Sequence, residues 1–246
     1  MLKHSRDDLV LQLTLARSEK RNALDADLTH ALLQAIRVAG ADRGVGAILL
    51  DAEGPTFSAG MDLDESLGAD PHALGRVHAE LFAIRGEMEK PLVVAVQGPA
   101  FGGALGLIAN AHIVVAADTA EFGLTELRVG MWPFLVWRSV AAAIGERRTM
   151  ELALTSRMFG AAEALAFGLV HDVVPADRVA VRARELAHAV ANASGETIAR
   201  GLRASADPDR RLELRAEQFA SADFEEGVRA FREKRAPRWP SRVDSR

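Results

Sequence analysis

Three near-continuous apolar runs, separated by stretches with helical spacing, constrain the fold of this chain more than any other feature. The runs are VGAILLD (Val45 to Asp51), PLVVAVQG (Pro91 to Gly98) and HIVVAAD (His112 to Asp118). Runs of this kind predict strands that are buried on both faces, as in a parallel sheet covered by helices. LVLQLTL (Leu9 to Leu15) alternates apolar and polar residues and therefore predicts a further, half-buried strand.

The stretches between these runs have the spacing of amphipathic helices. Residues 24–39, LDADLTHALLQAIRVA, place Asp25 where a helix cap is expected, and residues 72–89 repeat the pattern after Pro71. From Glu146 onward the pattern is almost entirely helical. Strands that alternate with helices predict an α/β layered fold. We expect a core over residues 1–190 and a helical region over residues 191–246, with no long linker and no fixed-period repeat.

The composition excludes several kinds of site. The chain has 246 residues, 49% apolar and 26% charged, which is typical of an ordinary globular protein. It has no cysteine, so disulfides, iron–sulfur clusters and thiolate zinc sites are excluded, and its seven histidines form no HExxH pattern, so no metal is expected. The N terminus lacks an apolar signal core, and no apolar run reaches the ~20 residues of a membrane span. We therefore expect a cytoplasmic protein with no membrane segment.

The C-terminal segment, residues 228–246, is basic although the net charge of the chain is −4. Seven basic residues against two acidic ones give 7 − 2 = +5. The basic residues are Arg229, Arg232, Lys234, Arg235, Arg238, Arg242 and Arg246, and the acidic ones are Glu233 and Asp244. The segment is either a solvated face or tail or a site for a small phosphate-bearing ligand. Nucleic acid is not expected, because the chain as a whole is not basic.

Two glycine-rich segments follow predicted buried strands. In GPTFSAGMDLDE (residues 54–65), Gly60 can take a positive φ or let another group come very close, and Met61 then offers its backbone N–H. In PAFGGALGLIAN (residues 99–110), Gly102 and Gly103 stand where a helix begins with unsatisfied N–H groups, a place that suits negative charge. Close packing of a helix on the sheet explains an isolated glycine pair equally well.

The best-known glycine motifs do not account for these segments. Neither has the GxGxxG or GKS/GKT spacing of nucleotide-binding loops, and GxSxG is absent around Ser58. A third segment, EFGLTELRVGMWP (residues 121–133), carries Glu126. Taken alone, Glu126 is best explained as a surface or salt-bridged residue. The combination of the three segments, in this order, points to a more specific function.

In order along nearly the whole chain, these segments resemble the crotonase superfamily, the enoyl-CoA hydratases and isomerases. The motifs that carry the resemblance are RNAL (Arg21 to Leu24), FSAGMDLDE, GPAFGGALG, FGLTELRVG, AAEALAFGLVHDVVP and EGVRAFREKRAP. The resemblance implies an α/β fold, a crotonase-like spiral of ββα units with a helical C-terminal trimerisation region. It also implies a homotrimer or a dimer of trimers, in which the C-terminal region serves oligomerisation and helps to cover CoA, often that of a neighbouring subunit.

The resemblance further implies an acyl-CoA substrate and no separate cofactor, because coenzyme A enters as part of the thioester. Two backbone N–H groups, those of Met61 and Gly103, are expected to hold the thioester oxygen. A donor of this kind is commonly worth ~3 kcal/mol in the transition state. The substrate and CoA contacts that the resemblance implies are Arg21, Ala23, Leu24, Ala59, Gly60, Met61, Asp62, Leu63, Asp64, Gly102, Gly103, Trp132, Phe231 and Lys234.

The acid and base groups set the expected reaction. Hydratases of this family carry two glutamates, and here the first position falls on Gly106 while the second is Glu126. One carboxylate suffices to move a proton from C2 to C4, so the pattern favours a Δ3,Δ2-enoyl-CoA isomerase. A 2-enoyl-CoA hydratase is the alternative, and a non-catalytic CoA-binding or assembly protein is less favoured. GMWPFLVW (residues 130–137) resembles the apolar stretch of mitochondrial-type isomerases, and its aromatic residues line either the acyl pocket or the core.

Overall fold

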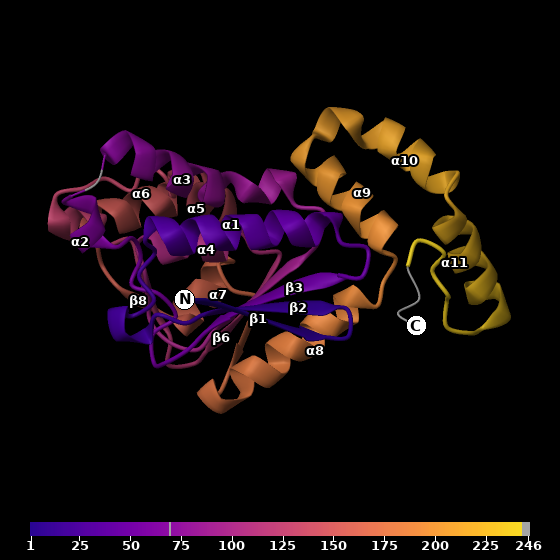
Figure 1. The fold of residues 1–246 in the computed structure, drawn as a ribbon, viewed down its shortest axis with the longest axis horizontal. Coiled ribbons are helices and arrows are strands. Elements are labelled where there is room, and N and C mark those ends of the chain that lie inside the picture. Colours follow the sequence, from indigo (N-terminus) through magenta and orange to yellow (C-terminus); the bar gives the residue numbers. More distant parts are fainter. Residues whose placement is uncertain (69, 243–246) are drawn as a thin grey trace.

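The main sheet has six strands in the computed structural model, which describes residues 1–68 and 70–242 (Figure 1). All neighbouring strands are parallel except β1 and β2. In sheet order, the strands are β1 (Leu2–Asp7), β2 (Val10–Leu15), β3 (Ala47–Ala52), β4 (Leu92–Val96), β6 (Ile113–Ala117) and β9 (Asp172–Val174). The three apolar runs are β3, β4 and β6 at the centre, and the alternating run is β2. These four predictions are therefore confirmed.

The predicted helical stretches are also helices. Asp25 accepts a hydrogen bond from the Leu28 amide at 2.8 Å, so it caps α1 as expected. The stretch after Pro71 divides into α3 and the short 3-10 helix η2. The helices are α1 (Ala26–Ala41), α2 (Leu63–Ser66), α3 (Pro71–Ala83), α4 (Gly103–Asn110), α5 (Trp137–Ile144), α6 (Glu146–Thr155), α7 (Ala161–Phe167), α8 (Val179–Ala191), α9 (Gly195–Ala206), α10 (Arg211–Phe219) and α11 (Ala222–Glu233). The 3-10 helices are η1 (Ser18–Lys20), η2 (Ile84–Glu87), η3 (Glu126–Val129), η4 (Ala176–Arg178) and η5 (Pro208–Arg210).

Helices cover the sheet on both faces. Figure 1 shows α1 and α3 on one side of the strands and α8 on the other, and α8 contacts β3, β4 and β6. This cover explains why β4 is apolar at every position, since all five of its side chains are buried. None of the helices that the structure describes is long and apolar enough to cross a membrane.

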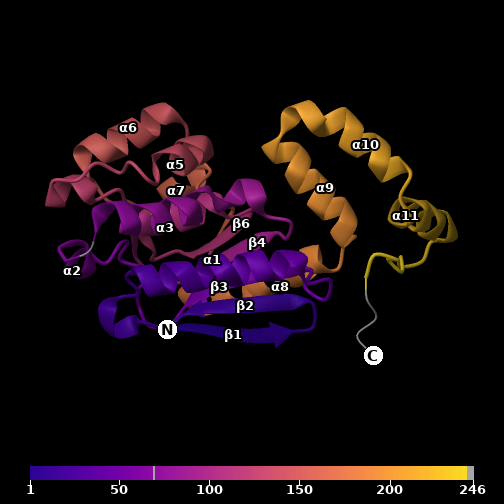
Figure 2. The ribbon, with the colours of Figure 1, turned by 45° about the horizontal axis from the view of Figure 1, so that its top comes forward.

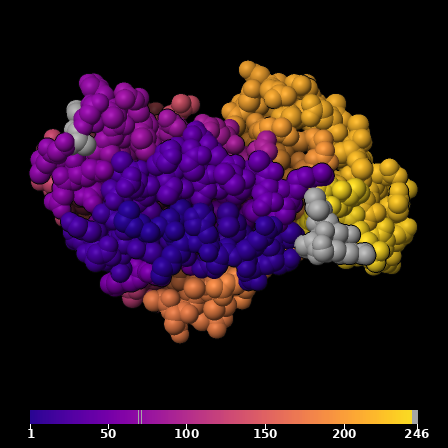
Figure 3. Space-filling view, viewed as in Figure 1, coloured from indigo at the N-terminus to yellow at the C-terminus, as the bar shows by residue number. Residues whose placement is uncertain are grey.

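The last three helices, α9 to α11, form an arm that projects from the sheet and its covering helices (Figures 2 and 3). Ser194 caps α9 after α8 has ended at Ala191. The arm lies at the end of the molecule opposite to α2 in both ribbon views.

The residues that follow the arm fold back onto it and onto the end of α8. The Arg238 amide donates to Glu226 Oε1 at 2.7 Å, Trp239 Nε1 donates to the Asn192 carbonyl at 3.0 Å, and Arg242 donates to the Ala193 carbonyl at 2.9 Å. An exposed, unattached tail is therefore the wrong interpretation of residues 238–242. Hydrogen bonds from the Arg235 guanidinium, which has the larger effect, and from the Arg238 amide lower the pKa of the Glu226 carboxyl to about 2. Asp244 and Arg246 of the basic segment lie outside the described residues.

Two histidines serve as hydrogen-bond acceptors at the start of the parallel strands. Nδ1 of His112 accepts from the Leu92 amide at 3.0 Å, and Nδ1 of His171 accepts from the Val114 amide at 3.1 Å. Both contacts need a ring nitrogen without a proton. Burial, helped by the Arg85 guanidinium, lowers the pKa of His112 from 6.5 to about 4 and lowers that of His171 as well.

We expect the free energy of unfolding to fall as the pH is lowered from 6.5 towards 4. In this range His112 takes up a proton in the unfolded chain but not in the folded one, so acid favours unfolding, and the loss levels off below pH 4. The lowered pKa corresponds to at most about 3 kcal/mol over this range.

Urea unfolding of the wild type and of His112→Gln at pH 7 and pH 5 measures the effect. Glutamine does not titrate, so this variant should lose less stability on acidification, whereas His30→Gln on the exposed side of α1 should behave like the wild type. Equal pH dependence in all three proteins would contradict the assignment.

Candidate active site

The three segments singled out in the sequence lie next to one another beyond the carboxyl ends of β3, β4 and β6. A second, smaller sheet joins them, formed by β5 (Ala100–Phe101), β7 (Glu121–Gly123) and β8 (Phe159–Gly160). Two isolated parallel bridges extend this row, one between Leu24 and Met61 and the other between Ser58 and Ala100. The segments after successive strands of the main sheet therefore form a second row, and this row brings the glycine-rich segments and Glu126 together.

Gly60 is the point of closest approach between the two glycine-rich segments. Its φ is +92°, and a Cβ placed on it would lie 2.6 Å from the carbonyl oxygen of Phe101 and 3.0 Å from the nitrogen of Gly103. Both neighbours are backbone atoms that no side-chain movement can relieve. Only glycine fits here.

Two backbone amides converge at this contact. Gly103 is the first residue of α4, where N–H groups have no partner within the helix, and a Cβ on Gly103 would lie 3.4 Å from the nitrogen of Met61. Among the residues that the structure describes, neither the Met61 nor the Gly103 N–H has a hydrogen-bond acceptor. The two donors are thus adjacent, and each is available to an oxygen atom of a ligand.

Glu126 faces the same place from the other side of Gly102. It begins η3, three residues after Gly123, whose carbonyl accepts the Gly102 amide at 2.8 Å. A Cβ on Gly102 would lie 3.4 Å from Glu126 Oε1. The other oxygen, Oε2, is buried and has no hydrogen-bond partner in the described part of the chain. Burial raises the pKa of the Glu126 carboxyl above its ordinary value, and a smaller contribution from its own backbone amide lowers it. A carboxyl group in these surroundings can exchange a proton with a bound molecule.

The space beside Gly106 is filled. A Cβ on this residue would lie 2.6 Å from Phe82 Cδ1 and 2.7 Å from Val136 Cγ1. A glutamate side chain therefore does not fit at this position unless Phe82 or Val136 moves. Glu126 has no carboxylate opposite it on the first turns of α4.

The aromatic residues after η3 differ in their surroundings. Trp132 and Trp137 stack with their ring centroids 5.5 Å apart, and both are partly buried against the core. Phe134 is 77% exposed, so it belongs to neither the core nor an enclosed pocket within this chain. The sequence pattern grouped these three residues, whereas the structure separates Phe134 from the other two.

The RNAL segment lies directly against the loop that carries Gly60. The Arg21 carbonyl accepts the Ala59 amide at 2.9 Å, and the Leu24 amide donates to the Gly60 carbonyl at 2.8 Å. Ala23 and Leu24 are buried, while Arg21 is exposed. Farther along, Asp62 is buried, but Leu63 and Asp64 are exposed at the start of α2.

Asn22 and Ser58 hold this loop in place, and the sequence analysis missed both. The Asn22 side chain donates to the carbonyls of Glu53 at 2.8 Å and Thr56 at 2.9 Å, and it accepts the Arg17 amide at 2.9 Å. Ser58 Oγ donates to the Asn22 carbonyl at 2.8 Å. Asn22 has a φ of +52°, a left-handed conformation that asparagine adopts more readily than most residues. The available signal was an asparagine inside the RNAL motif, directly before the apolar Ala23 and Leu24.

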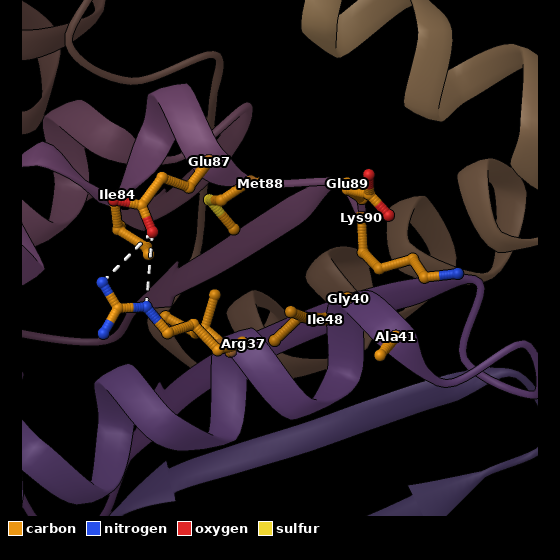
Figure 4. A pocket seen from close by; sticks show the side chains of 10 residues that line it. Arg37, Gly40, Ala41, Ile48, Ile84, Glu87, Met88, Glu89 and Lys90 are labelled. Atoms are coloured by element: carbon orange, nitrogen blue, oxygen red, sulfur yellow. Dashed lines mark hydrogen bonds and ion pairs between the residues drawn. The ribbon is translucent and has the colours of Figure 1, made fainter.

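A pocket of about 260 Å³ lies elsewhere, at the amino ends of β3 and β4 (Figure 4). Ile48 and Met88 contribute apolar surface, and Arg37 at its rim is held by Glu87 at 3.1 Å. Burial lowers the pKa of the neighbouring Lys90. This pocket is separate from the candidate site, because the glycine-rich segments follow the opposite ends of these strands.

The family of the protein follows from comparison with known proteins. The family model described as enoyl-CoA hydratase/isomerase matches residues 5–242 of this chain. The chain belongs to the enoyl-CoA hydratase/isomerase family. Its crotonase-like fold, which the motifs predicted, is confirmed by solved structures of the same architecture.

Relatives in this family match the chain over nearly its whole length. The probable enoyl-CoA hydratase echA8 of Mycobacterium bovis is 34% identical over 250 residues, and the alignment covers 96% of this chain and 96% of the relative. The 2,3-dehydroadipyl-CoA hydratase of Escherichia coli is 31% identical over 249 residues, which cover 97% of this chain and 98% of the relative. A crystal structure of an enoyl-CoA hydratase from Shewanella pealeana superimposes with a TM-score of 0.89 at 31% identity, over 97% of this chain and 95% of that one.

In this member of the enoyl-CoA hydratase/isomerase family, the C-terminal arm does not approach the site of its own chain. Phe231 is 85% exposed, and Lys234 is exposed at the end of α11. Figures 1 and 2 place α11 at the far end of the molecule from α2, which follows Met61. The structure therefore brings together Met61, Gly103 and Glu126 but not the two expected contacts from the arm.

Proposed function

We propose that this enzyme isomerises 3-enoyl-CoA to 2-enoyl-CoA, with Glu126 as its only acid and base. The observation that carries the proposal is the pairing of a partly buried Glu126 with a filled space at Gly106. Glu126 takes a proton from C2 of the thioester, the electrons shift into a dienolate, and the same carboxyl returns a proton to C4. The double bond moves from C3–C4 to C2–C3, and no water is consumed.

The Met61 and Gly103 amides are assigned to the thioester oxygen. Negative charge grows on this oxygen as the C2 proton leaves, so preorganised N–H donors stabilise the transition state more than the ground state. Neither N–H has an acceptor within the described chain, and this supports the assignment.

The surroundings of Glu126 suit a group that must both accept and return a proton. Burial raises the pKa of the Glu126 carboxyl, so this pKa lies closer to neutral pH than that of an ordinary glutamate. A general acid and base works best when its pKa lies near the working pH. No second group is needed when the proton that leaves C2 is delivered to C4.

Hydration of 2-enoyl-CoA is the second candidate function. The names of the relatives from Mycobacterium bovis and Escherichia coli favour it, because both are called hydratases. Hydration requires a water to be oriented and a proton to be delivered, and one carboxylate does both less readily than two. A non-catalytic CoA-binding or assembly protein is a weaker alternative, because such a protein has no need of a partly buried carboxylate beside the thioester site.

Incubation of the purified protein with a 3-enoyl-CoA and with crotonyl-CoA, in parallel and with identification of the products, tests the proposal. We expect the 3-enoyl-CoA to be converted to the 2-enoyl-CoA faster than crotonyl-CoA is hydrated. Faster hydration would establish the second candidate, and no turnover of either together with CoA binding would establish the non-catalytic one.

Introducing the missing carboxylate extends this test. Gly106→Glu alone should lower the melting temperature, because overpacking a filled core typically costs about 1–3 kcal/mol. The double variant Phe82→Ala/Gly106→Glu opens the space that the side chain needs. It should hydrate crotonyl-CoA at least about tenfold faster than Phe82→Ala, its matched control, because a positioned acid or base typically contributes about 10²–10⁴-fold. Equal hydration by the two folded variants would argue that position 106 does not face the acyl group.

The proposal assigns CoA binding to the RNAL segment, to residues 59–64 and to Trp132, with Phe231 and Lys234 supplied by a second copy of the chain. The position of α11, at the end of the molecule opposite to α2, supports this arrangement. We infer a cytoplasmic homotrimer or dimer of trimers with no cofactor beyond the CoA of the substrate. Light scattering of the purified protein measures the mass, and a monomer that retains full activity would contradict the shared site.

A further inference from the structure

A buried arginine contacts the side chain of Asp62, the residue that directly follows Met61. Arg17 is 8% exposed, and its NH2 group lies 3.0 Å from Asp25 Oδ2 and 3.2 Å from Asp62 Oδ2. Its NH1 group donates to the Ala23 carbonyl at 2.6 Å. One guanidinium therefore connects the RNAL segment, the start of α1 and the loop that carries Met61.

Asp62 is the link between this arginine and the site, because it directly follows Met61. Its Oδ1 accepts the amides of Asp64 at 3.1 Å and Glu65 at 3.4 Å, so it also caps α2. Burial alone would raise the pKa of the Asp62 carboxyl, but the Glu65 amide and the Arg17 guanidinium together lower it below its ordinary value. Asp62 is thus an ionised carboxylate held from two sides.

Backbone hydrogen bonds on either side of Met61 complete the restraint. The Leu24 amide donates to the Gly60 carbonyl at 2.8 Å, and the Asp62 amide donates to the Leu24 carbonyl at 3.0 Å. Fully buried His78 places Nε2 3.2 Å from that same Leu24 carbonyl and so ties α3 to the pair. The peptide plane that carries the Met61 N–H is therefore fixed by its neighbours, while the N–H itself has no acceptor among the described residues.

Stability alone is a weak reason for such a cluster. Burying an ion pair costs desolvation, and apolar residues of similar size often stabilise a fold equally well. In this cluster, Arg17 Nε is buried and has no hydrogen-bond partner within the described residues. Precise geometry is a better reason, because a catalytic group displaced by about 1 Å can lose about 10²-fold in rate.

We propose that Arg17 is a positioning residue that, through Asp62, directs the Met61 N–H at the thioester oxygen. The inference rests on the proposed function, since it requires a thioester oxygen at these amides. Asp62 transmits the restraint because it neighbours Met61 in the chain, whereas Asp25 contacts the same guanidinium nitrogen from the start of α1.

Two isosteric variants separate this role from a structural one. Asp62→Asn and Asp25→Asn each replace one carboxylate partner of Arg17 by a neutral amide of the same shape, and asparagine still caps a helix. Each protein is titrated by calorimetry with butyryl-CoA and with S-butyl-CoA, a thioether that lacks the carbonyl. The ratio of the two dissociation constants reports the hydrogen bonds to the thioester oxygen. The infrared stretching frequency of a ¹³C-labelled carbonyl in bound butyryl-CoA reports the geometry of these hydrogen bonds. Arg17→Lys serves as a third variant, because lysine lacks the planar guanidinium of arginine.

We expect the wild type to bind butyryl-CoA about tenfold more tightly than S-butyl-CoA, the usual effect of one or two net hydrogen bonds. Asp62→Asn and Arg17→Lys should reduce this preference to about twofold and shift the carbonyl stretch towards its value in free butyryl-CoA. Both ligands carry the same CoA, so a change in the CoA contacts alone would weaken both and leave the ratio as it is in the wild type. Asp25→Asn should keep the preference. A folded Asp62→Asn protein with the wild-type preference for butyryl-CoA would overturn the role of Arg17 but not the proposed function. An equal loss of this preference in Asp25→Asn would do the same. If the wild type itself shows no preference for the thioester, the proposed oxyanion site fails, and the role of Arg17 fails with it.

Discussion

Replacing Glu126 with glutamine is expected to lower kcat for a 3-enoyl-CoA by about 10³-fold, in the middle of the range that a positioned acid or base contributes. Glutamine keeps the shape of the side chain but cannot accept the C2 proton. The affinity for CoA should be unchanged, because Glu126 faces the acyl group and not the nucleotide in the proposed arrangement. Stopped-flow turnover and calorimetry with CoA measure the two quantities separately.

The pH profile of the wild type provides an independent test of Glu126. The base must be ionised to take the proton from C2, so kcat/KM should fall as the pH is lowered through its pKa. Burial raises this pKa above the value of an ordinary glutamate, and the fall should therefore begin at a higher pH. The matched control is Glu121→Gln, the same change at an exposed position of β7, which should leave both rate and profile unaltered. A Glu126→Gln protein that retains more than about a tenth of the wild-type rate would show that another group is the base.

Much of the fold could be predicted because its signals are local. The runs that become β3, β4 and β6 are apolar throughout, since helices cover both faces of the sheet. Asp25 was identifiable as a helix cap because its partner, Leu28, is only three residues away. Signals of this kind depend on neighbours within one turn of helix or one strand.

The elements that were missed depend on distant partners. β9 has only three residues and is a strand because it pairs with β6, more than fifty residues earlier. The N-terminal β1 is mostly polar, since it lies at the edge of the sheet. The folding back of residues 238–242 depends on partners such as Asn192 and Glu226, which no local pattern reveals.

The candidate site shows the same division. Gly60, Gly103 and Glu126 were identified because their motifs follow one another along the chain in a known order. Their convergence requires the second row of short strands and bridges, in which no segment pairs over more than three residues and no periodic signal exists. Arg17 was missed for another reason. It stands between a predicted strand and the RNAL motif close to two other charged residues, Glu19 and Lys20, and only the fold shows that two buried or partly buried carboxylates contact it.

Replacing Gly103 with proline is expected to lower turnover by about 10²–10³-fold or more, the usual cost of removing one oxyanion donor. Proline has no N–H, and its ring would occupy the space into which the Gly103 amide points. The first position of a helix tolerates proline, so α4 itself should persist. Glu126 would remain in place, and the loss would therefore be specific to stabilisation of the oxygen. Turnover of a 3-enoyl-CoA by a protein that circular dichroism shows to be folded is the measurement.

The matched control at this position is Gly103→Ala, which keeps the N–H and adds only a methyl group. That methyl would lie 3.2 Å from Phe82 Cζ, a side-chain atom that can shift slightly, and 3.4 Å from both Cγ and the backbone nitrogen of Met61, an ordinary van der Waals distance. We expect the alanine variant to keep activity within about tenfold of the wild type, since the donor is retained. The residue before the substitution, Gly102, has a φ of +53° and a ψ of −120°, outside the region that proline favours for its predecessor. The melting temperature of the proline variant must therefore be compared with that of the alanine variant. If both are folded and turn over substrate equally well, the Gly103 amide does not hold the thioester oxygen, and the donor pair must be sought elsewhere.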